Sequence, residues 1–265
     1  MLKRSLEPVL KGRRIETVEV RERRLRVLVP RAFASDLADR RIAGLRRRSK
    51  YLLIDLDGGK TLVIHLGMSG RLTAARGEMP PEPHEHIVFR LDRGIRLRFR
   101  DPRRFGLATV VDTARLDRHV LFRGLGVEPL EPGFDGSTLE RLAAGRRGPV
   151  KSFLMDGRLV VGVGNIYATE SLWRAGIHPA RSVARIASVR WEALATAVKE
   201  TLAHAIREGG TTLNDFADGA GNAGEFQIAL EAYDRAGEPC ARCGTPIRRL
   251  VQAGRSSYYC AGCQR

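Results

Sequence analysis

Residues 240–263 read CARCGTPIRRLVQAGRSSYYCAGC, and this stretch decides how the C-terminal part of the chain folds. It holds all four cysteines of the sequence, as two Cys-x-x-Cys pairs separated by sixteen residues: Cys240, Cys243, Cys260 and Cys263. That spacing is typical of a structural zinc site, whereas a disulfide framework would spread cysteines through a small secreted domain. Because four thiolates complete a closed tetrahedral shell, we predict one structural Zn²⁺ that takes no part in chemistry. Four free thiols are the alternative.

Between the two cysteine pairs, the sequence predicts a hairpin with an arginine at its tip. Two zinc-pinned strands joined through Ala253-Gly254-Arg255 would hold Arg255 on a rigid turn. A guanidinium group in that place suits bidentate contact with a phosphate. For Arg255 considered alone, an ordinary surface arginine is the alternative.

The first half of the chain has the pattern of β-strands. Two apolar runs, 51–56 and 61–66, flank the turn 57–60, and the runs 86–91 and 95–100 form a second hairpin pattern. In the last run, apolar residues alternate with three arginines, so one face belongs to the core and the other carries guanidinium groups. One interpretation of that second face is an exposed, solvated surface. Strands spaced in this way predict an antiparallel sandwich.

Beyond residue 126 the apolar period becomes helical. Ser188 is placed to cap a helix that Gly209-Gly210 end. The apolar stripe of this helix consists of Trp191, Leu194, Val198, Leu202 and Ala205. Residues 212–228 are polar and rich in glycine, which predicts a mobile loop.

The charge of the chain points to a polyanionic partner. Lys and Arg number 46 against 30 Asp and Glu, a net charge of +16. Each phosphate that a protein neutralises releases condensed counterions, so nucleic acid is the expected partner. A general preference for arginine in the source proteome is the alternative, since Ala, Arg, Leu and Gly are all abundant. The sequence shows neither a membrane-spanning apolar run nor a secretory signal, and we expect a cytoplasmic, nucleoid-associated monomer.

Several blocks of the sequence resemble formamidopyrimidine-DNA glycosylases, a bacterial family related to endonuclease VIII. The blocks are RRSKYLL (47–53), HLGMSGRL (65–72), DPRRFG (101–106), LVVGVGNIYATESL (159–172), AGIHP (175–179), GGTTLNDF (209–216) and GRSSYYC (254–260). They occur in order along essentially the whole chain. The resemblance implies an α+β fold with an antiparallel β-sandwich catalytic domain over 1–125, a helix–two-turn–helix DNA-binding domain over 126–230 and a zinc finger over 231–265.

The resemblance also implies a wedge that fills the gap left by an extruded nucleotide. The matching residues are Met68, Arg103 and Phe105. A flexible apolar chain, a planar cation and an aromatic ring suit stacking and pairing with an orphaned base. Without the resemblance, Met68 would be interpreted as a core residue and Phe105 as hairpin packing.

Further roles are implied for residues that match the family's DNA contacts and chemistry. Contacts with the DNA backbone are implied for His84, Arg146, Lys151 and Asn165. Two catalytic roles are implied as well, for Lys50 in β-elimination beside the abasic sugar and for Arg255 in the second elimination step. Glycines before Asn165 let the main chain approach a phosphate, and the N–H groups of a helix start favour an anion.

The family chemistry begins with an N-terminal proline, whose amine attacks C1′, and an adjacent glutamate that acts as acid and base. This sequence begins at Met1 without such a pair, and no capping residue precedes Leu2. We therefore expect the start to be truncated. The alternative is a protein that recognises lesions without excising them, with residual Schiff-base chemistry at Lys50 or the Met1 amine.

Together these features predict a base-excision glycosylase and AP lyase that removes oxidised purines, such as 8-oxoguanine and formamidopyrimidines, from duplex DNA. The abasic strand would then be cleaved by β,δ-elimination. A rival from another class is a non-enzymatic zinc-ribbon factor that binds RNA or the ribosome. That rival explains the charge and the cysteines, but not the wedge or the Gly-Val-Gly-Asn block.

Overall fold

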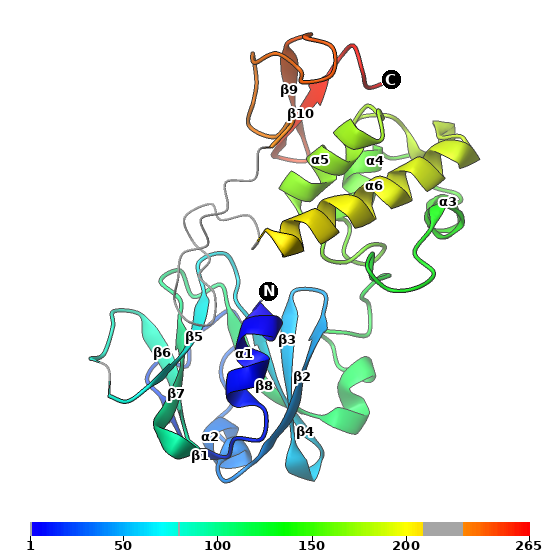
Figure 1. Cartoon of the computed structure of the whole chain (residues 1–265). Helices are drawn as coiled ribbons and strands as arrows, with labels where there is room; N and C mark the ends of the chain where they lie inside the picture. The colour runs from blue at the N-terminus through cyan, green and yellow to red at the C-terminus, as the bar shows by residue number, and fades with distance from the viewer. Residues whose placement is uncertain (1, 79, 209–229) are drawn as a thin grey trace. The chain divides into compact units, whose positions relative to one another are not determined.

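The computed structural model describes residues 2–78, 80–208 and 230–265. They divide into two compact units, with the boundary between Arg123 and Gly124. Figure 1 shows strands and short helices in the first unit, and helices with a terminal hairpin in the second. The predicted helix end at Gly209-Gly210 and the predicted loop 212–228 lie outside the described residues. Within the described ranges, no helix combines the length and apolar character needed to cross a membrane.

The first unit is a sandwich of two antiparallel sheets, with strand orders β1-β6-β7-β5 and β2-β3-β4-β8. The strands are β1 Ile15–Val20, β2 Ile42–Arg48, β3 Tyr51–Leu56, β4 Lys60–His65, β5 Arg71–Arg76, β6 Glu85–Leu91, β7 Ile95–Arg100 and β8 Leu107–Asp112. The helices of this unit are α1 Leu2–Leu10 and α2 Phe33–Leu37, with 3₁₀ turns η1 Asp57–Gly59, η2 Asp92–Gly94 and η3 Thr113–Arg118. The predicted sandwich and both predicted hairpins are confirmed.

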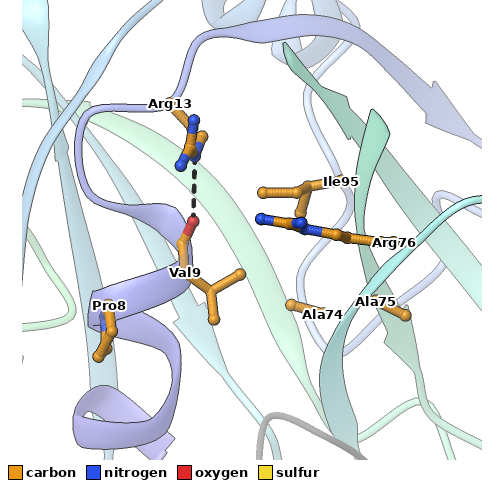
Figure 2. Close-up of a pocket in the computed structure, with 7 residues that line it drawn as sticks. All are labelled: Pro8, Val9, Arg13, Ala74, Ala75, Arg76 and Ile95. Carbon is orange, nitrogen blue, oxygen red and sulfur yellow. Dashed lines mark hydrogen bonds between the residues drawn. The ribbon is translucent and has the colours of Figure 1, made fainter. Parts of the chain in front are cut away.

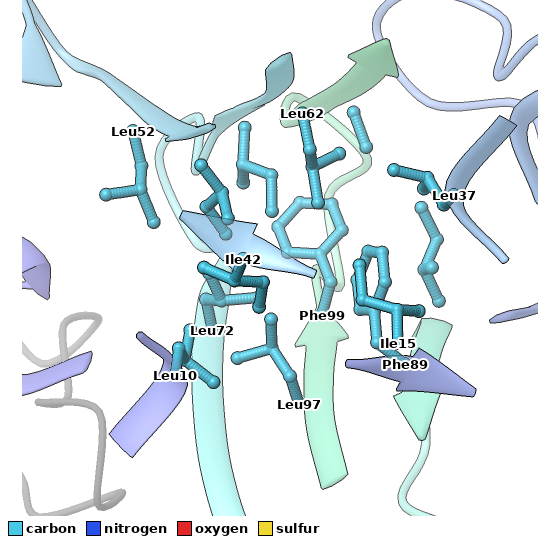
Figure 3. Packing of buried hydrophobic residues seen from close by; sticks show 14 of the residues in the cluster. Leu10, Ile15, Leu37, Ile42, Leu52, Leu62, Leu72, Phe89, Leu97 and Phe99 are labelled. Carbon is cyan, nitrogen blue, oxygen red and sulfur yellow. The ribbon is translucent and has the colours of Figure 1, made fainter. Parts of the chain in front are cut away.

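One apolar core fills the space between the two sheets. Figure 3 shows Leu62 of β4 and Phe99 of β7 pointing into the same interior. Helix α1 adds Leu6 and Leu10, which are fully buried because residues four apart share one helix face. Its Val9 points away from this core and is 37% exposed. Each large apolar side chain buried in this way contributes about 1.5–3 kcal/mol.

The outer face of β7 is not the solvated surface that one interpretation of the sequence predicted. Its three alternating arginines bind the segment before β6 and the first residue of β6. Arg96 pairs with Glu78, Arg98 with Glu82 and Glu85, and Arg100 donates to the main-chain oxygen of Pro83. The Arg98 and Glu85 side chains are almost completely buried. Because a buried charge that loses its partner is strongly destabilising, this ion pair fixes residues 80–85 on the sheet.

The second unit packs its helices around Trp191, which is buried against Phe153 with ring centroids 5.5 Å apart. The helices are α3 Gly136–Ala143, α4 Val150–Met155, α5 Asn165–Arg174 and α6 Ser188–Arg207, with the 3₁₀ turn η4 Val183–Arg185. The predicted apolar stripe of α6 faces this core and is confirmed. The predicted cap is wrong: Ala187 is the N-cap, and the Ser188 hydroxyl donates to Glu140 at 2.7 Å.

The hairpin of β9 Ile247–Gln252 and β10 Arg255–Cys260 completes the second unit. Its two-residue turn has positive φ at Ala253 (46°) and Gly254 (72°), as the right-handed twist of a tight hairpin requires. Arg255 is the first residue after the turn, opposite Gln252. The predicted α+β fold, with its sandwich, helical part and cysteine-bearing hairpin, is confirmed.

Candidate nucleic-acid interface

Strand register collects the predicted residues of the first unit at one end of the sandwich. In one sheet Tyr51 pairs with His65, and His65 pairs with Leu107. In the other sheet Arg100 lies opposite both Arg71 and Glu85. The loops 66–70 and 101–106 connect the two sheets at this end, and the turn after β2 and the loop before β6 lie there too. These four connections carry Lys50, Met68, His84, Arg103 and Phe105.

The three predicted wedge residues present their side chains at the surface. Met68 is 56% exposed and Phe105 is 45% exposed, so their interpretation as core and packing residues is wrong. The Arg103 guanidinium lies over the Phe105 ring, 4.7 Å from its centroid, which is a cation–π contact. Apolar and planar side chains displayed together on rigid loops are able to enter a base stack.

Glycine lets the two wedge loops approach each other closely. Gly67, with φ of +70°, lies directly before Met68. A β-carbon at Gly67 would stand 2.5 Å from the carbonyl carbon of Phe105. The loops therefore pack main chain against main chain, and a side chain at position 67 would separate Met68 from Phe105.

Lys50 lies in the turn between β2 and β3, exposed at the same end as the wedge. Burial, reinforced by the charges of Arg26 and Lys50, lowers the pKa of His65 to about 4. The imidazole is therefore neutral at physiological pH, and its Nδ1 accepts a hydrogen bond of 3.0 Å from the main-chain N–H of Gly67. The uncharged ring of His65 thus supports the loop of Met68 and is close enough to Lys50 to feel its charge.

His84 is held by its main chain, while its side chain is exposed. It has φ of +65°, in the left-handed region, and its carbonyl oxygen accepts from the N–H of Asp101 at 3.0 Å. The arginines of β7 fix the residues just before it. An imidazole displayed from a fixed main chain is suited to contact a phosphate oxygen.

In the second unit, Asn165 begins α5, and the first turn of this helix contains no acidic residue. Its Oδ1 is buried without a hydrogen-bond partner among the described residues. Two glycines shape the main chain that leads into this helix. Gly162 has φ of +81°, and Gly164 is the N-cap. The N–H groups at the start of a helix and the helix dipole favour an anion at this point.

Lys151 and Arg255 meet on β10. The Lys151 side chain is buried, and its Nζ donates to the Ser256 carbonyl oxygen at 3.0 Å and to Ser257 Oγ at 2.8 Å. Arg255 is exposed, and its main chain lies opposite Gln252 in the hairpin. Arg146 is also exposed, and its Nε donates to the Leu142 carbonyl oxygen at 3.0 Å.

The four cysteines lie close enough together to hold one metal ion. Their Sγ atoms all lie within 4.8 Å of one another, as a tetrahedral zinc shell requires: Cys240, Cys243, Cys260 and Cys263. The donor set is complete without water, so a bound Zn²⁺ would supply structure only. It would tie the turn at 240–243 to the end of β10 and so brace the hairpin that carries Arg255.

Sequence reasoning missed the residues that dock the cysteine-bearing segment on α5. Glu170 is almost fully buried, and its carboxylate accepts three main-chain N–H bonds of 2.8–3.0 Å from residues 231–233. The Arg242 guanidinium lies 4.0 Å from the centre of the Trp173 ring. A polar residue on the inner face of a predicted helix is the one local signal that marks Glu170.

A pocket of about 290 Å³ lies between the end of α1 and strands β5 and β7 (Figure 2). Val9 and Ala74 line its apolar side, and Arg13 and Arg76 its polar side. Arg13 donates from Nε to the Val9 carbonyl oxygen at 3.4 Å. None of the predicted site residues lines this pocket, so the candidate interface is a surface of loops and helix ends.

Three protein-family models match the chain. Residues 1–108 match the formamidopyrimidine-DNA glycosylase N-terminal domain, residues 125–217 its H2TH domain, and residues 237–265 the zinc finger found in FPG and IleRS. Among curated relatives, a formamidopyrimidine-DNA glycosylase of Methylococcus capsulatus is 50% identical over 99% of this chain and 96% of its own. One of Burkholderia thailandensis is 48% identical over the same shares.

Solved structures with this architecture include complexes with damaged DNA. The Lactococcus lactis Fpg bound to abasic-site DNA has a TM-score of 0.89 at 29% identity and covers 100% of this chain and 97% of that one. The MutM (Fpg) protein of Thermus thermophilus has a TM-score of 0.87 at 36% identity, covering 99% and 96%. Another Lactococcus lactis complex holds DNA that contains Fapy-dG, with a TM-score of 0.88.

Proposed function

The chain belongs to the formamidopyrimidine-DNA glycosylase family, and from that membership we propose that it removes oxidised purines from duplex DNA and then cleaves the abasic strand. Its substrates are 8-oxoguanine and formamidopyrimidines, and its place of action is the nucleoid. A zinc-ribbon factor for RNA is not favoured, because residues 1–108 match a glycosylase domain.

The observation that carries this proposal is the exposure of Met68, Arg103 and Phe105 on neighbouring loops at one end of the sandwich. Apolar side chains exposed to water raise the free energy of the protein. Insertion between stacked bases would bury them against an apolar surface. The wedge enters the helix where the damaged nucleotide leaves it, and Arg103 donates to the base that has lost its partner.

The remaining predicted residues hold the DNA backbone. Asn165 binds a phosphate at the start of α5, supported by the helix dipole. His84 and Arg146 are exposed and bind further phosphates. Lys151 is buried, so we assign its influence on DNA to the β10 contacts that hold Arg255.

Strand cleavage uses the cations of Lys50 and Arg255. In the chain preceded by Pro-Glu, the proline amine attacks C1′, the glycosidic bond to the damaged base breaks, and the sugar is left bound to the amine as an iminium. Lys50 then assists the first elimination and Arg255 the second. Lys50 lies in the turn after β2, and Arg255 is the first residue of β10, directly after the Ala253-Gly254 turn. The zinc centre supports Arg255 and takes no chemical part.

Borohydride trapping on abasic-site DNA tests this function. The chain preceded by Pro-Glu-Leu-Pro-Glu-Val-Glu is expected to form a covalent adduct and to cleave an 8-oxoguanine:cytosine duplex, whereas the chain that starts at Met1 forms little adduct. In the extended form, Arg255→Lys should accumulate the β-elimination product, and Lys50→Met should slow its formation. Absence of adduct and cleavage in both forms would show a lesion-binding protein instead.

A further inference from the structure

A single buried carboxylate lies where the loops of the wedge meet. The Asp101 side chain has no exposed surface. Its Oδ1 accepts from the Ser69 hydroxyl at 2.8 Å, and its Oδ2 accepts from the Gly106 N–H at 2.7 Å. Ser69 follows Met68 and Gly106 follows Phe105, so the two oxygens of one carboxylate bind the neighbours of both apolar wedge residues.

Ser69 extends this connection to the third wedge residue. Its Oγ accepts from the main-chain N–H of Arg103 at 3.3 Å while it donates to Asp101. The hydroxyl thus bridges the loop of Met68 and the loop of Arg103 and Phe105, which are more than thirty residues apart in sequence. One hydroxyl therefore links the main chain of Arg103 to the carboxylate of Asp101.

The main chain of Asp101 ties in the loop of His84. Its N–H donates to the His84 carbonyl oxygen at 3.0 Å. The ring of His86, at the start of β6, lies 2.7 Å from the Asp101 carbonyl oxygen. All three loops that carry predicted DNA contacts at this end of the sandwich therefore bond to Asp101.

Gly106 packs closely against its neighbours at the end of the loop that carries Arg103 and Phe105. A β-carbon at Gly106 would stand 2.5 Å from the Phe99 ring and 3.0 Å from Asp101 Oδ2. Gly106 also gives its carbonyl oxygen to the N–H of Arg26, at 3.0 Å. The end of the wedge loop is consequently fixed on both sides, and the carboxylate closes the connection to Ser69.

We propose that Asp101, acting through Ser69, is a positioning residue that assembles Met68, Arg103 and Phe105 into one wedge before DNA binds. This inference rests on the proposed function, since it assigns a task to the same site. Asp101 is buried and touches no DNA; its effect is to hold the loops in the geometry of insertion. Binding is tighter when the entropy of ordering has been removed in advance, so loosened loops weaken insertion and leave backbone attraction in place.

The experiment uses duplexes with a tetrahydrofuran abasic-site analogue, which cannot be cleaved, and 2-aminopurine beside it, which brightens when the wedge unstacks it. Ser69→Ala and Asp101→Asn are expected to keep affinity for undamaged duplex within about twofold. They should lose about tenfold in the preference for the tetrahydrofuran duplex, as expected for one hydrogen bond to a charged group. The rise of 2-aminopurine emission should fall in parallel, and Ser69→Thr, which keeps the hydroxyl, should restore both.

A matched control separates positioning from general stability. Thr61 is a buried hydroxyl that donates to Asp55 at 2.9 Å, near the end of β4 that lies away from the loop of Met68. Thr61→Val should lower thermal stability by a similar amount but keep the lesion preference and the emission signal. Should Asp101→Asn fail to fold, Ser69→Ala carries the test.

Two results would overturn the inference in distinguishable ways. A wild-type chain that neither prefers the tetrahydrofuran duplex nor unstacks 2-aminopurine contradicts the wedge itself, and with it the proposed function. A normal wild-type signal that Ser69→Ala leaves unchanged contradicts only the role of Asp101 and Ser69.

Discussion

The ammonium group of Lys151 donates a hydrogen bond to the carbonyl oxygen of Ser256, the residue that follows Arg255, at 3.0 Å. Burial, with a smaller contribution from the charge of Arg255, lowers the pKa of Lys151 to about 8. The cation is therefore present at neutral pH and is lost as the pH rises through 8. Affinity for a tetrahydrofuran duplex at constant ionic strength should fall through the same range, because one positive charge beside Arg255 disappears.

Lys151→Met provides the control for this titration. It removes the charge but keeps a side chain of similar length, so affinity should be weaker at neutral pH and flat across pH 8. Folding should respond with the opposite sign. The folded pKa lies below the ordinary 10.5, so the unfolded chain binds more protons between about 8 and 10.5, and this group adds stability as the pH rises through that window. A pH dependence of binding that survives in Lys151→Met would contradict the assignment.

Removal of zinc should release the hairpin and leave the sandwich folded. Structural zinc sites contribute about 10–16 kcal/mol, and the described segment after Leu230 shares a small apolar cluster with Trp173 of α5. Trp173 belongs to that cluster, so a chelator should shift its emission to the red and abolish DNA binding. A Trp173→Phe variant identifies the source of the shift against Trp191. Retention of tight DNA binding in metal-free protein would contradict this role of the metal.

Replacement of Glu170 by glutamine should loosen residues 231–233. The amide places an NH2 group, which has two donors and no acceptor, where one of the two carboxylate oxygens accepts main-chain N–H groups, so buried donors are left facing each other. We expect a loss of about 2–4 kcal/mol in unfolding free energy and faster proteolysis at this segment. Glu200→Gln, on the exposed face of α6, is the matched control and should be nearly neutral.

Alanine at Gly67 should cost more than alanine at Gly59, although both glycines have φ near +70°. Nothing lies within 4 Å of a β-carbon at Gly59, so that variant reports the left-handed conformation alone, about 1 kcal/mol. At Gly67 the clash with Phe105 adds to it, for a total of about 3 kcal/mol. Urea unfolding measures both, and equal losses would show that the loops are free to separate.

The features that sequence predicted are those encoded locally. Two cysteine pairs at metal spacing predict the centre, and alternation in 95–100 predicts an inward face of Ile95, Leu97 and Phe99, all of which are buried. The hairpin turn before Arg255 likewise follows from Ala253-Gly254. In each case a few neighbouring residues contain the whole signal.

The features that sequence did not predict depend on distant partners. The carboxylate of Glu170 binds main-chain groups more than sixty residues away, and Lys151 binds a carbonyl 105 residues away. The outward arginines of β7 have the periodicity of a solvated face, yet their partners in the segment before β6 bury Arg98. Periodicity describes which way a side chain points but does not identify what covers it.

The docking of the hairpin on α4 and α5 has a consequence for ligand binding. Asn165 and Arg255 belong to one compact unit, joined through Lys151, Glu170 and Arg242. Under the proposed function, a DNA backbone bound by one of these two residues meets the other at a high effective concentration. Substitutions that break the contacts of Lys151, Glu170 or Arg242 should therefore weaken DNA binding even though Asn165 and Arg255 are both unchanged, because the two residues would then bind independently.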